Sequence, residues 1–262
     1  MYGSKRVSSN YLAVAEIRFS AGVDISNFIM TAQEYFSQAN YAQVSVLKNQ
    51  GMKTEQFGEQ NMLVPTVQKI YAFTNRDATR QFILNEHCLV FKVTDFQDFD
   101  SFMALFQEGV YLANKLIHIV SSQRMGLRLL KRIMPRSGLG MRDYLQPSEA
   151  NVLGRFGGLS GFSQTEFTHQ FDGIHLLHRV KTSPHSGLEL PKDIHSQDMA
   201  FNADVLTYHG PSIFLDSDGF VEKHQDLSLP TVKDNLKNIH AILGLAFQSS
   251  VSDLALSEIG FR

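Results

Sequence analysis

Three stretches of the chain repeat apolar residues every three or four positions. They cover residues 25–39, 99–116 and 230–247. This spacing gathers apolar side chains on one face of an α-helix, so each stretch is predicted to be an amphipathic helix packed on a core. Pro230 stands in the first turn of the third helix, where proline is favoured, and Asp24 is placed to cap the first. The three stripes are Ile25, Phe28, Ile29, Ala32, Tyr35, Phe36 and Ala39; Phe99, Phe102, Met103, Phe106, Val110, Ala113 and Leu116; and Val232, Leu236, Ile239, Leu243 and Ala246.

Strand patterns fill the chain between these helices. Short apolar runs, rich in β-branched and aromatic residues and separated by polar breaks, are typical of strands. Residues 49–61 are largely polar and are predicted to form a long loop. The predicted strands cover residues 11–19, 43–48, 68–74, 79–84, 88–94 and 124–134.

Residues 162–171 and 174–181 are predicted to form a β-hairpin. An Asp-Gly dipeptide separates the two runs and favours a two-residue turn. That turn sets Glu166 opposite Arg179, and it sorts the apolar side chains to one face of the hairpin and the polar side chains to the other. The hairpin therefore predicts an antiparallel sheet with one wet face.

Together these elements predict an α+β fold with antiparallel sheets and three principal helices. Glycines cluster in residues 135–161, which is typical of a hinge or connection. We expect an N-terminal α+β half at 1–135, a Gly-rich connection at 136–161 and a C-terminal α+β half at 162–262. A single compact domain is the alternative interpretation. Each half is expected to hold several antiparallel strands and to close on a helix, although no residue-level repeat supports a duplication.

Composition and charge exclude several classes of protein. The chain has 262 residues, of which 43% are hydrophobic, and its formal net charge is -2, so it has no global attraction to nucleic acid or to anionic membranes. Cys88 is the only cysteine, which excludes an internal disulfide and a thiolate zinc site. Charged residues interrupt the first apolar run, and no run approaches the roughly 18–20 apolar residues of a transmembrane helix. We expect a cytoplasmic protein that does not enter a membrane.

Four features could carry chemistry, and each has a structural interpretation that we favour. His169 and His178 are diagonal neighbours in the predicted hairpin, but the sequence offers no spaced motif that would supply further metal ligands. Residues 216–219, Asp-Ser-Asp-Gly, resemble the start of a calcium loop but lack its later ligands, so we predict a tight turn between two strands. The glycines of residues 154–161 precede a hairpin and not the helix of a phosphate loop. Cys88 alternates with apolar residues in a strand. We predict no catalytic residue, no metal site and no cofactor.

The candidate ligand-binding residues are Arg124, Arg128 and Arg132. They fall at every fourth position of a predicted strand, so their side chains share one face. A row of guanidinium groups suits the recognition of phosphate or carboxylate. The competing interpretation is a solvated outer face on which the arginines pair with acids of neighbouring strands. The row predicts a protein partner or a phosphate-bearing ligand, and the net charge argues against nucleic acid.

Residues 124–133, Arg-Met-Gly-Leu-Arg-Leu-Leu-Lys-Arg-Ile, carry a resemblance to a known family. Together with an early strand that begins Glu16-Ile-Arg and a late helix, they are similar to a sporadically distributed bacterial family of uncharacterised proteins of about this length, which has no assigned function. Leu129 stands where the family usually has an aromatic residue, and phenylalanine replaces the tryptophan common in its central helix. The resemblance implies no activity and carries no catalytic residue over. The scattered occurrence of that family among bacteria is compatible with bacterial defence or toxin–antitoxin contexts.

Three functional hypotheses follow. The first is a non-enzymatic binding or regulatory protein that works through the arginine row. The second is an RNA-binding or RNA-processing module of two small α+β halves, with the glycines near Gly157 close to the RNA backbone and His178 as a general base. The third is a small-molecule hydrolase or sensor with a pocket between sheet and helix. The sequence does not set the oligomeric state.

The turn-rich composition of residues 135–161 and 49–61 predicts where a protease cuts first. Exposed, loosely packed chain is the preferred substrate of proteases. Limited proteolysis followed by mass spectrometry of the fragments checks this expectation. Early cuts within residues 162–181 would contradict the assignment of the hairpin to the core sheet.

Overall fold

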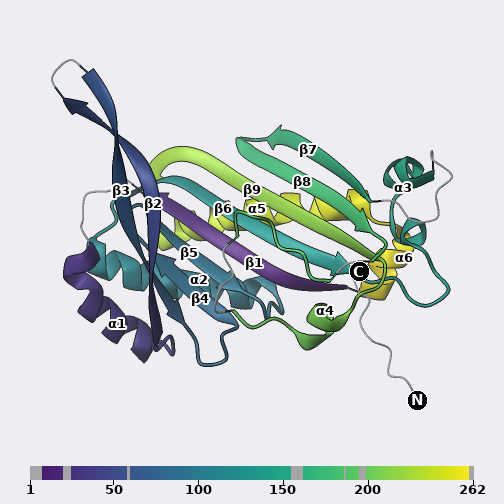
Figure 1. The fold of residues 1–262 in the computed structure, drawn as a ribbon, viewed down its shortest axis with the longest axis horizontal. Coiled ribbons are helices and arrows are strands. Elements are labelled where there is room, and N and C mark those ends of the chain that lie inside the picture. Colours follow the sequence, from purple (N-terminus) through teal and green to yellow (C-terminus); the bar gives the residue numbers. More distant parts are fainter. Residues whose placement is uncertain are drawn as a thin grey trace.

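The fold is α+β, with one antiparallel sheet and helices packed mainly on one of its faces (Figure 1). The computed structural model describes residues 8–19, 25–57, 60–154, 162–185, 187–194 and 199–259. The strands are β1 (Ser8–Phe19), β2 (Gln43–Phe57), β3 (Gln60–Thr74), β4 (Arg80–Leu84), β5 (Cys88–Val93), β6 (Ser121–Ile133), β7 (Ser163–Phe171), β8 (Ile174–Ser183) and β9 (Ser212–Asp226). The helices are α1 (Ile29–Gln38), α2 (Phe99–Ile117), α3 (Pro147–Gly154), α4 (Ala203–Thr207), α5 (Leu229–Ser250) and α6 (Asp253–Ile259), with short 3-10 turns η1 (Ile25–Phe28) and η2 (Met141–Tyr144).

The nine strands form one continuous sheet in the order β2-β3-β4-β5-β1-β6-β9-β8-β7. The β1–β6 pair lies at its centre. On each side of that pair the chain follows the same route: a first strand, a helical segment, a meander of strands, a last strand that returns beside the first, and a long closing helix. In the described residues the second half lacks a strand equivalent to β2. The two predicted halves therefore share one sheet, and their order of elements repeats.

The three predicted helices are confirmed. The first consists of η1 followed by α1, the second is α2, and the third is α5, which begins with Leu229 and Pro230. Ser228 caps α5 by accepting a hydrogen bond from the backbone N–H of Thr231. Asp24, the predicted cap of the first helix, lies outside the described residues.

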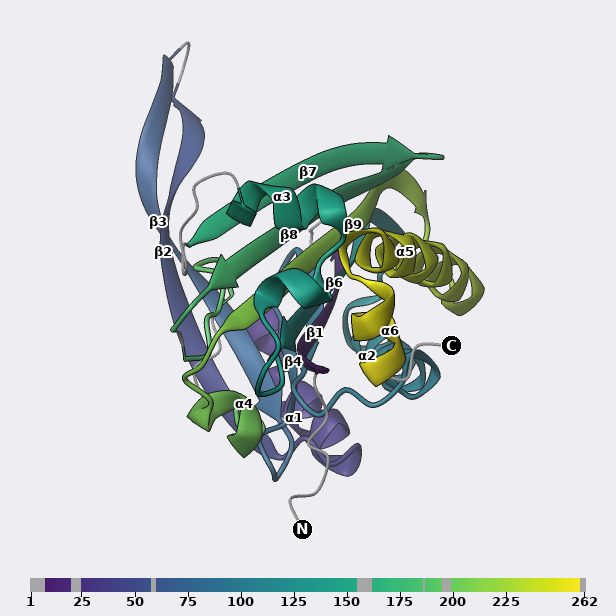
Figure 2. The same ribbon diagram turned by 90° about the vertical axis from the view of Figure 1, so that its right-hand side faces the viewer.

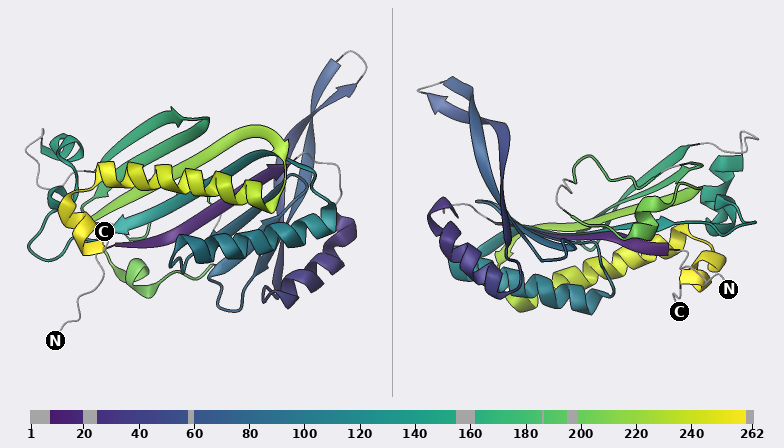
Figure 3. Two further views of the ribbon diagram at one scale, coloured as in Figure 1. Left: turned by 180° about the vertical axis from the view of Figure 1, so that it is seen from behind. Right: turned by 60° about the horizontal axis from the view of Figure 1, so that its bottom comes forward.

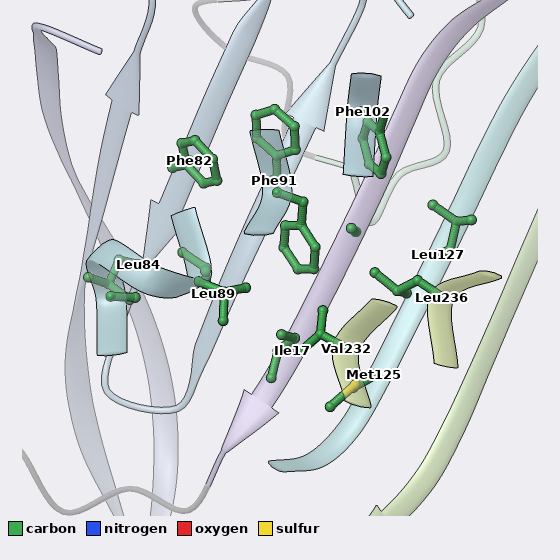
Figure 4. Close-up of a cluster of buried hydrophobic side chains, with 14 of the residues drawn as sticks. Ile17, Phe82, Leu84, Leu89, Phe91, Phe102, Met125, Leu127, Val232 and Leu236 are labelled. Atoms are coloured by element: carbon green, nitrogen blue, oxygen red, sulfur yellow. The ribbon is translucent and has the colours of Figure 1, made fainter. Parts of the chain in front are cut away.

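The main core lies between the helices and the sheet (Figure 4). In the part of this core formed by the first half of the chain, phenylalanine rings pack on one another. Phe82 stacks on Phe91 with ring centroids 4.3 Å apart, and Phe36 of α1 stacks on Phe73 at the same distance. Figures 2 and 3 show α2 and α5 side by side on this face, and the chain that follows β8 on the opposite face. The central strands are therefore covered on both sides.

The predicted hairpin is confirmed in its register. Glu166 pairs with Arg179 and Phe171 with Ile174. Asp172 and Gly173 have φ angles of 46° and 80°, as a two-residue turn requires at both central positions.

The predicted turn at residues 216–219 is wrong, because these residues lie inside the continuous strand β9. Asp216 and Asp218 point to the face opposite the helices, where arginines of β6 neutralise them. Gly219 points to the helices: a Cβ atom there would lie 2.6 Å from Ile239 Cγ2 of α5. The glycine permits close packing of α5 on the sheet and does not mark a turn.

The predicted loop at residues 49–61 is also wrong over the residues described. β2 and β3 pair without a break from Gln43–Thr74 to Phe57–Gln60 and form a long two-stranded arm that projects from the sheet (Figure 1). A projecting ribbon has no face that must cover a core, so a polar composition suits it. We name residues 49–57 and 60–68 the arm.

Shortening the arm is expected to leave the fold intact. β3 pairs with β4 only over Tyr71–Leu84 to Thr74–Gln81, so the distal arm pairs with itself alone. Replacing residues 50–67 by Asn-Gly should change the free energy of unfolding by less than about 1 kcal/mol, as for surface changes elsewhere. Thermal denaturation followed by circular dichroism measures this. A large fall in melting temperature would show that the arm supports the sheet.

Candidate functional site

The predicted arginine row lies on the face of the sheet opposite the long helices. We call this the open face. Residues 187–194 cross over part of it as a strap, and the arm stands at its other side (Figure 3). Acids of the neighbouring strands β1 and β9 share this face with the arginines. The structure separates the three arginines into two different roles.

Arg132 belongs to the scaffold. Its side chain is fully buried, and its guanidinium donates to the carbonyl oxygens of Val205 at 2.6 Å and Tyr208 at 2.9 Å. It also donates to Ser212 Oγ from Nε at 3.1 Å and from Nη2 at 2.9 Å. These bonds fix the segment between α4 and β9. With its donors used inside the protein, Arg132 does not face a ligand.

Arg128 is held by two carboxylates. Its Nε and Nη2 donate to the two oxygens of Asp216, each at 2.6 Å, and its Nη1 donates to Asp193 of the strap at 2.5 Å. Only 9% of the Arg128 side chain is exposed, against 68% for Asp193. Burial lowers the pKa of Arg128, but the hydrogen bonds and charges of the two acids outweigh it and raise the pKa overall. The guanidinium is therefore permanently charged and fixed in place.

Arg124 has the loosest set of partners in the row. Its Nη1 donates to Glu16 at 2.6 Å, whereas Asp218 and Glu222 lie at 4.0 Å and 3.9 Å from its other nitrogens. Its guanidinium lies 4.2 Å from the ring centroid of Phe220. Burial raises the pKa of Asp218 although Arg124 and Arg128 oppose this effect. This end of the row combines a partly exposed cation with a carboxyl group whose pKa is raised by burial.

A hollow of about 250 Å³ lies between this charged row, the strap and the base of the arm. One wall is apolar and comes from β2 to β5; the other carries the charges. Lys92 lies at its floor, and burial lowers the pKa of this lysine to about 8. The hollow is lined by Val14, Glu16, Arg18, Leu47, Ile70, Ile83, Val90, Lys92, Arg124, Gly126, Arg128, Asp193, Ile194 and Asp218. A ligand with both an apolar and a charged part fits such a lining.

A second hollow of about 540 Å³ lies on the other side of the strap. Its charges are paired within the protein: Arg179 donates to Glu166 at 2.6 Å and to Asp216 at 3.2 Å, and Lys181 pairs with Glu189. Asp216 thus joins Arg128 and Arg179 in one network. The strap lies over a face whose charges of both signs alternate.

Two of the remaining sequence candidates, Cys88 and the pair His169 and His178, lie within the described residues. Burial raises the pKa of the Cys88 thiol to about 11, which leaves it protonated near neutral pH. His169 is exposed and close to Phe171, whereas His178 is buried, so the two rings have different surroundings. No group of three potential metal ligands occurs among the described residues. The glycines of residues 155–161 lie outside them.

His178 lies between two serines. Its Nδ1 is 2.8 Å from Ser217 Oγ and its Nε2 is 2.9 Å from Ser250 Oγ. Ser250 Oγ donates to the Ala246 carbonyl at 3.0 Å, so it accepts from the histidine and is not activated as a nucleophile. The serine hydroxyls here replace the backbone partners that are usual for a buried histidine.

The sequence missed the partner side chains that complete the site. Asp193, Asp216 and Ser212 lie 65, 88 and 80 positions from the arginines that they contact. The only signal was the alternation of Asp216 and Asp218, which places two carboxylates on one face of a strand. Lys92 gave no signal, because one lysine in a strand is typical of a wet face.

No protein-family model matches the sequence, and no curated protein is significantly similar to it. The resemblance to the sporadic bacterial family therefore stays a prediction. None of the described helices combines the length and apolar composition needed to cross a bilayer.

Replacing Arg128 with alanine is expected to destabilise the protein. The change leaves the Asp216 carboxylate, with 13% of its side chain exposed, without its bidentate partner. Breaking a buried pair from one side costs about 3–5 kcal/mol. Urea denaturation of both proteins measures the difference in the free energy of unfolding.

Arg18→Ala is the matched control for that experiment. Arg18 pairs with Glu16 on the same face, but 54% of its side chain is exposed, so its loss should cost about 1 kcal/mol or less. Equal effects of the two substitutions would show that Arg128 is not part of the scaffold.

The stability of the protein is expected to fall in mild acid through His178. Burial lowers the pKa of His178 from 6.5 to about 4. As the pH falls from about 6.5 towards 4, the histidine of the unfolded chain takes up a proton that the buried ring of the folded protein does not. The free energy of unfolding therefore falls over this range, by up to about 3 kcal/mol. Comparing urea denaturation of the wild type and His178→Gln across this range checks it. A constant difference between the two proteins would refute a titrating His178.

Proposed function

We propose that the protein is a non-enzymatic binding protein whose open face holds a segment of a partner protein. The observation that carries the proposal is the hollow beside Arg124, which joins an apolar wall to a row of fixed charges. The partner segment would place an apolar side chain against Leu47 and Ile70 and an acidic side chain near Arg124. This proposal keeps the site in the arginine row and narrows its ligand to a polypeptide.

The strap supports this choice of ligand. Residues 187–194 of the chain itself lie over the sheet, with Ile194 in the hollow and the Asp193 carboxylate on Arg128. An apolar and an acidic side chain, adjacent in the sequence at the turn closed by the hydrogen bond from the Ile194 N–H to the Pro191 carbonyl, are thus already accommodated on this face. A partner segment of the same chemistry would lie beside the strap and extend towards the arm.

The charge pattern favours a protein over a nucleic acid. Binding to a phosphate backbone requires a surface of excess positive charge. Here Glu16, Asp216 and Asp218 lie among the arginines, and the formal net charge of the chain is -2. Interleaved charges of both signs give specificity for a complementary protein surface. We therefore propose protein binding and treat RNA binding as the outcome that would contradict it.

Leu47→Lys is expected to weaken partner binding. The substitution puts an unpaired ammonium group on the apolar wall, which should lower affinity at least about tenfold. Tagged protein is used to recover partners from cells of its source, and bound proteins are quantified by mass spectrometry. A partner recovered with the wild type should be lost with the variant.

Val46→Lys is the control. Val46 is the neighbouring residue of β2, points to the opposite face and is 52% exposed, so the same charge is added outside the hollow. It should recover the partner as the wild type does. A titration with random-sequence RNA at two salt concentrations completes the test: saturable binding with a steep dependence on salt would replace the protein partner by RNA.

A further inference from the structure

An apolar groove of about 670 Å³ lies on the helix side of the sheet, between α5 and the β7–β8 hairpin. It is on the face opposite the arginine row. Ile242, Leu245, Ala246 and Ser249 form one wall, at the spacing of a helix face. Phe167, Phe171 and Leu176 of the hairpin form the other wall, and His178 and Ser250 lie in the groove as well.

The groove exposes an unusual amount of apolar side chain. Leu245 is 65% exposed, Phe167 48% and Phe171 47%. Single exposed apolar residues are ordinary, but a contiguous set that lines one groove marks an interaction site. The two phenylalanines are on β7, which is the outermost strand of the sheet among the described residues.

The repeated order of elements shows what covers the corresponding place in the first half. Counting outward from the β1–β6 pair, β8 and β7 correspond to β4 and β3, and α5 corresponds to α2. In the first half, α1 lies beside α2 and under β3 and β4. Phe36 of α1 stacks on Phe73 of β3 at 4.3 Å and lies 5.3 Å from Phe82 of β4.

The second half has no described helix in that place. α3, which occupies the same position in the order of elements, reaches only the end of the groove, through Ser148 and Glu149. The helices α1, α2 and α5 form a continuous layer under the sheet, and Figure 3 shows that β7 and β8 extend beyond its edge. The groove lies beside α5, where a further helix of this layer would pack.

We propose that the groove binds an amphipathic helix of a partner protein, in the place that α1 fills in the first half. The helix would set apolar residues at i, i+3 or i+4 and i+7 against Leu245, Phe167 and Phe171. Glu149 lines the groove together with Ser249 and Ser250, the last residues of α5, and the C-terminal end of a helix is partially negative. The occupant therefore carries a lysine or arginine at that end.

The test uses two labelled peptides and the full-length protein. One peptide has the sequence of residues 25–39, which contains α1, with one lysine added at each end to supply the basic group near Glu149, and the other is a designed Leu/Ala/Lys helix of the same length. Fluorescence anisotropy should show saturable binding of at least one peptide. Leu245→Glu should weaken it at least about tenfold, since a carboxylate would be buried against apolar residues. Leu245 is exposed, so this change leaves folding unaffected.

Leu206→Glu is the matched control, because Leu206 of α4 is 45% exposed and lies outside the groove. It should bind the peptides as the wild type does. Peptides with two central prolines, which cannot form a helix, should not bind.

Four results would overturn the proposal. The first two are that neither peptide binds, or that the proline peptides bind as well as the originals. The third is a dimer in sedimentation that Leu245→Glu dissociates, which would assign the groove to a second copy of the chain. The fourth is one-to-one binding of a fluorescent fatty acid that Leu245→Glu abolishes, which would assign the groove to a small apolar ligand. Because Leu47 and Leu245 lie on opposite faces, either binding proposal can fail without the other.

Discussion

A sheet whose two faces are both covered can carry charge at its centre only where each charge has a partner. Arg128 meets this condition through Asp216 on the adjacent strand and Asp193 on the strap. The pairing lets β6 and β9 lie side by side with apolar residues towards the helices and ions towards the open face. It also lets the strap lie over the sheet. The main core, the charge network and both hollows of the open face depend on this arrangement of β6 and β9.

Much of the fold could be predicted from local patterns. The three helices follow from stripes of apolar residues, and the hairpin follows from the Asp-Gly turn and the sorting of its two faces. Failures came where tertiary contacts overrode local preference. Asp216 to Gly219 has the composition of a turn, but arginines neutralise its acids and α5 requires its glycine, so it forms a strand. The arm is polar because it projects away from the core.

The candidate site could be predicted only in part. The four-residue spacing placed Arg124, Arg128 and Arg132 on one face of a strand, as the structure has them. The same spacing could not say which of them is buried, because their partners lie far away in the sequence. Nor could it show the apolar groove, whose walls come from the hairpin and from α5. A groove is a property of two elements together, and the pattern of neither element alone shows it.

The position of β1 in the middle of the sheet has a consequence for how the chain is made. During synthesis the first half can form up to α2, with β1 already paired to β5. The other edge of β1 stays unpaired until β6 has been synthesised, and an unpaired strand edge can pair with other polypeptide chains. β6 follows α2 directly, so the exposure is short. Slow translation just after α2 would prolong it, and the nascent chain would then be most prone to aggregate at a strand that lies in the interior of the finished sheet.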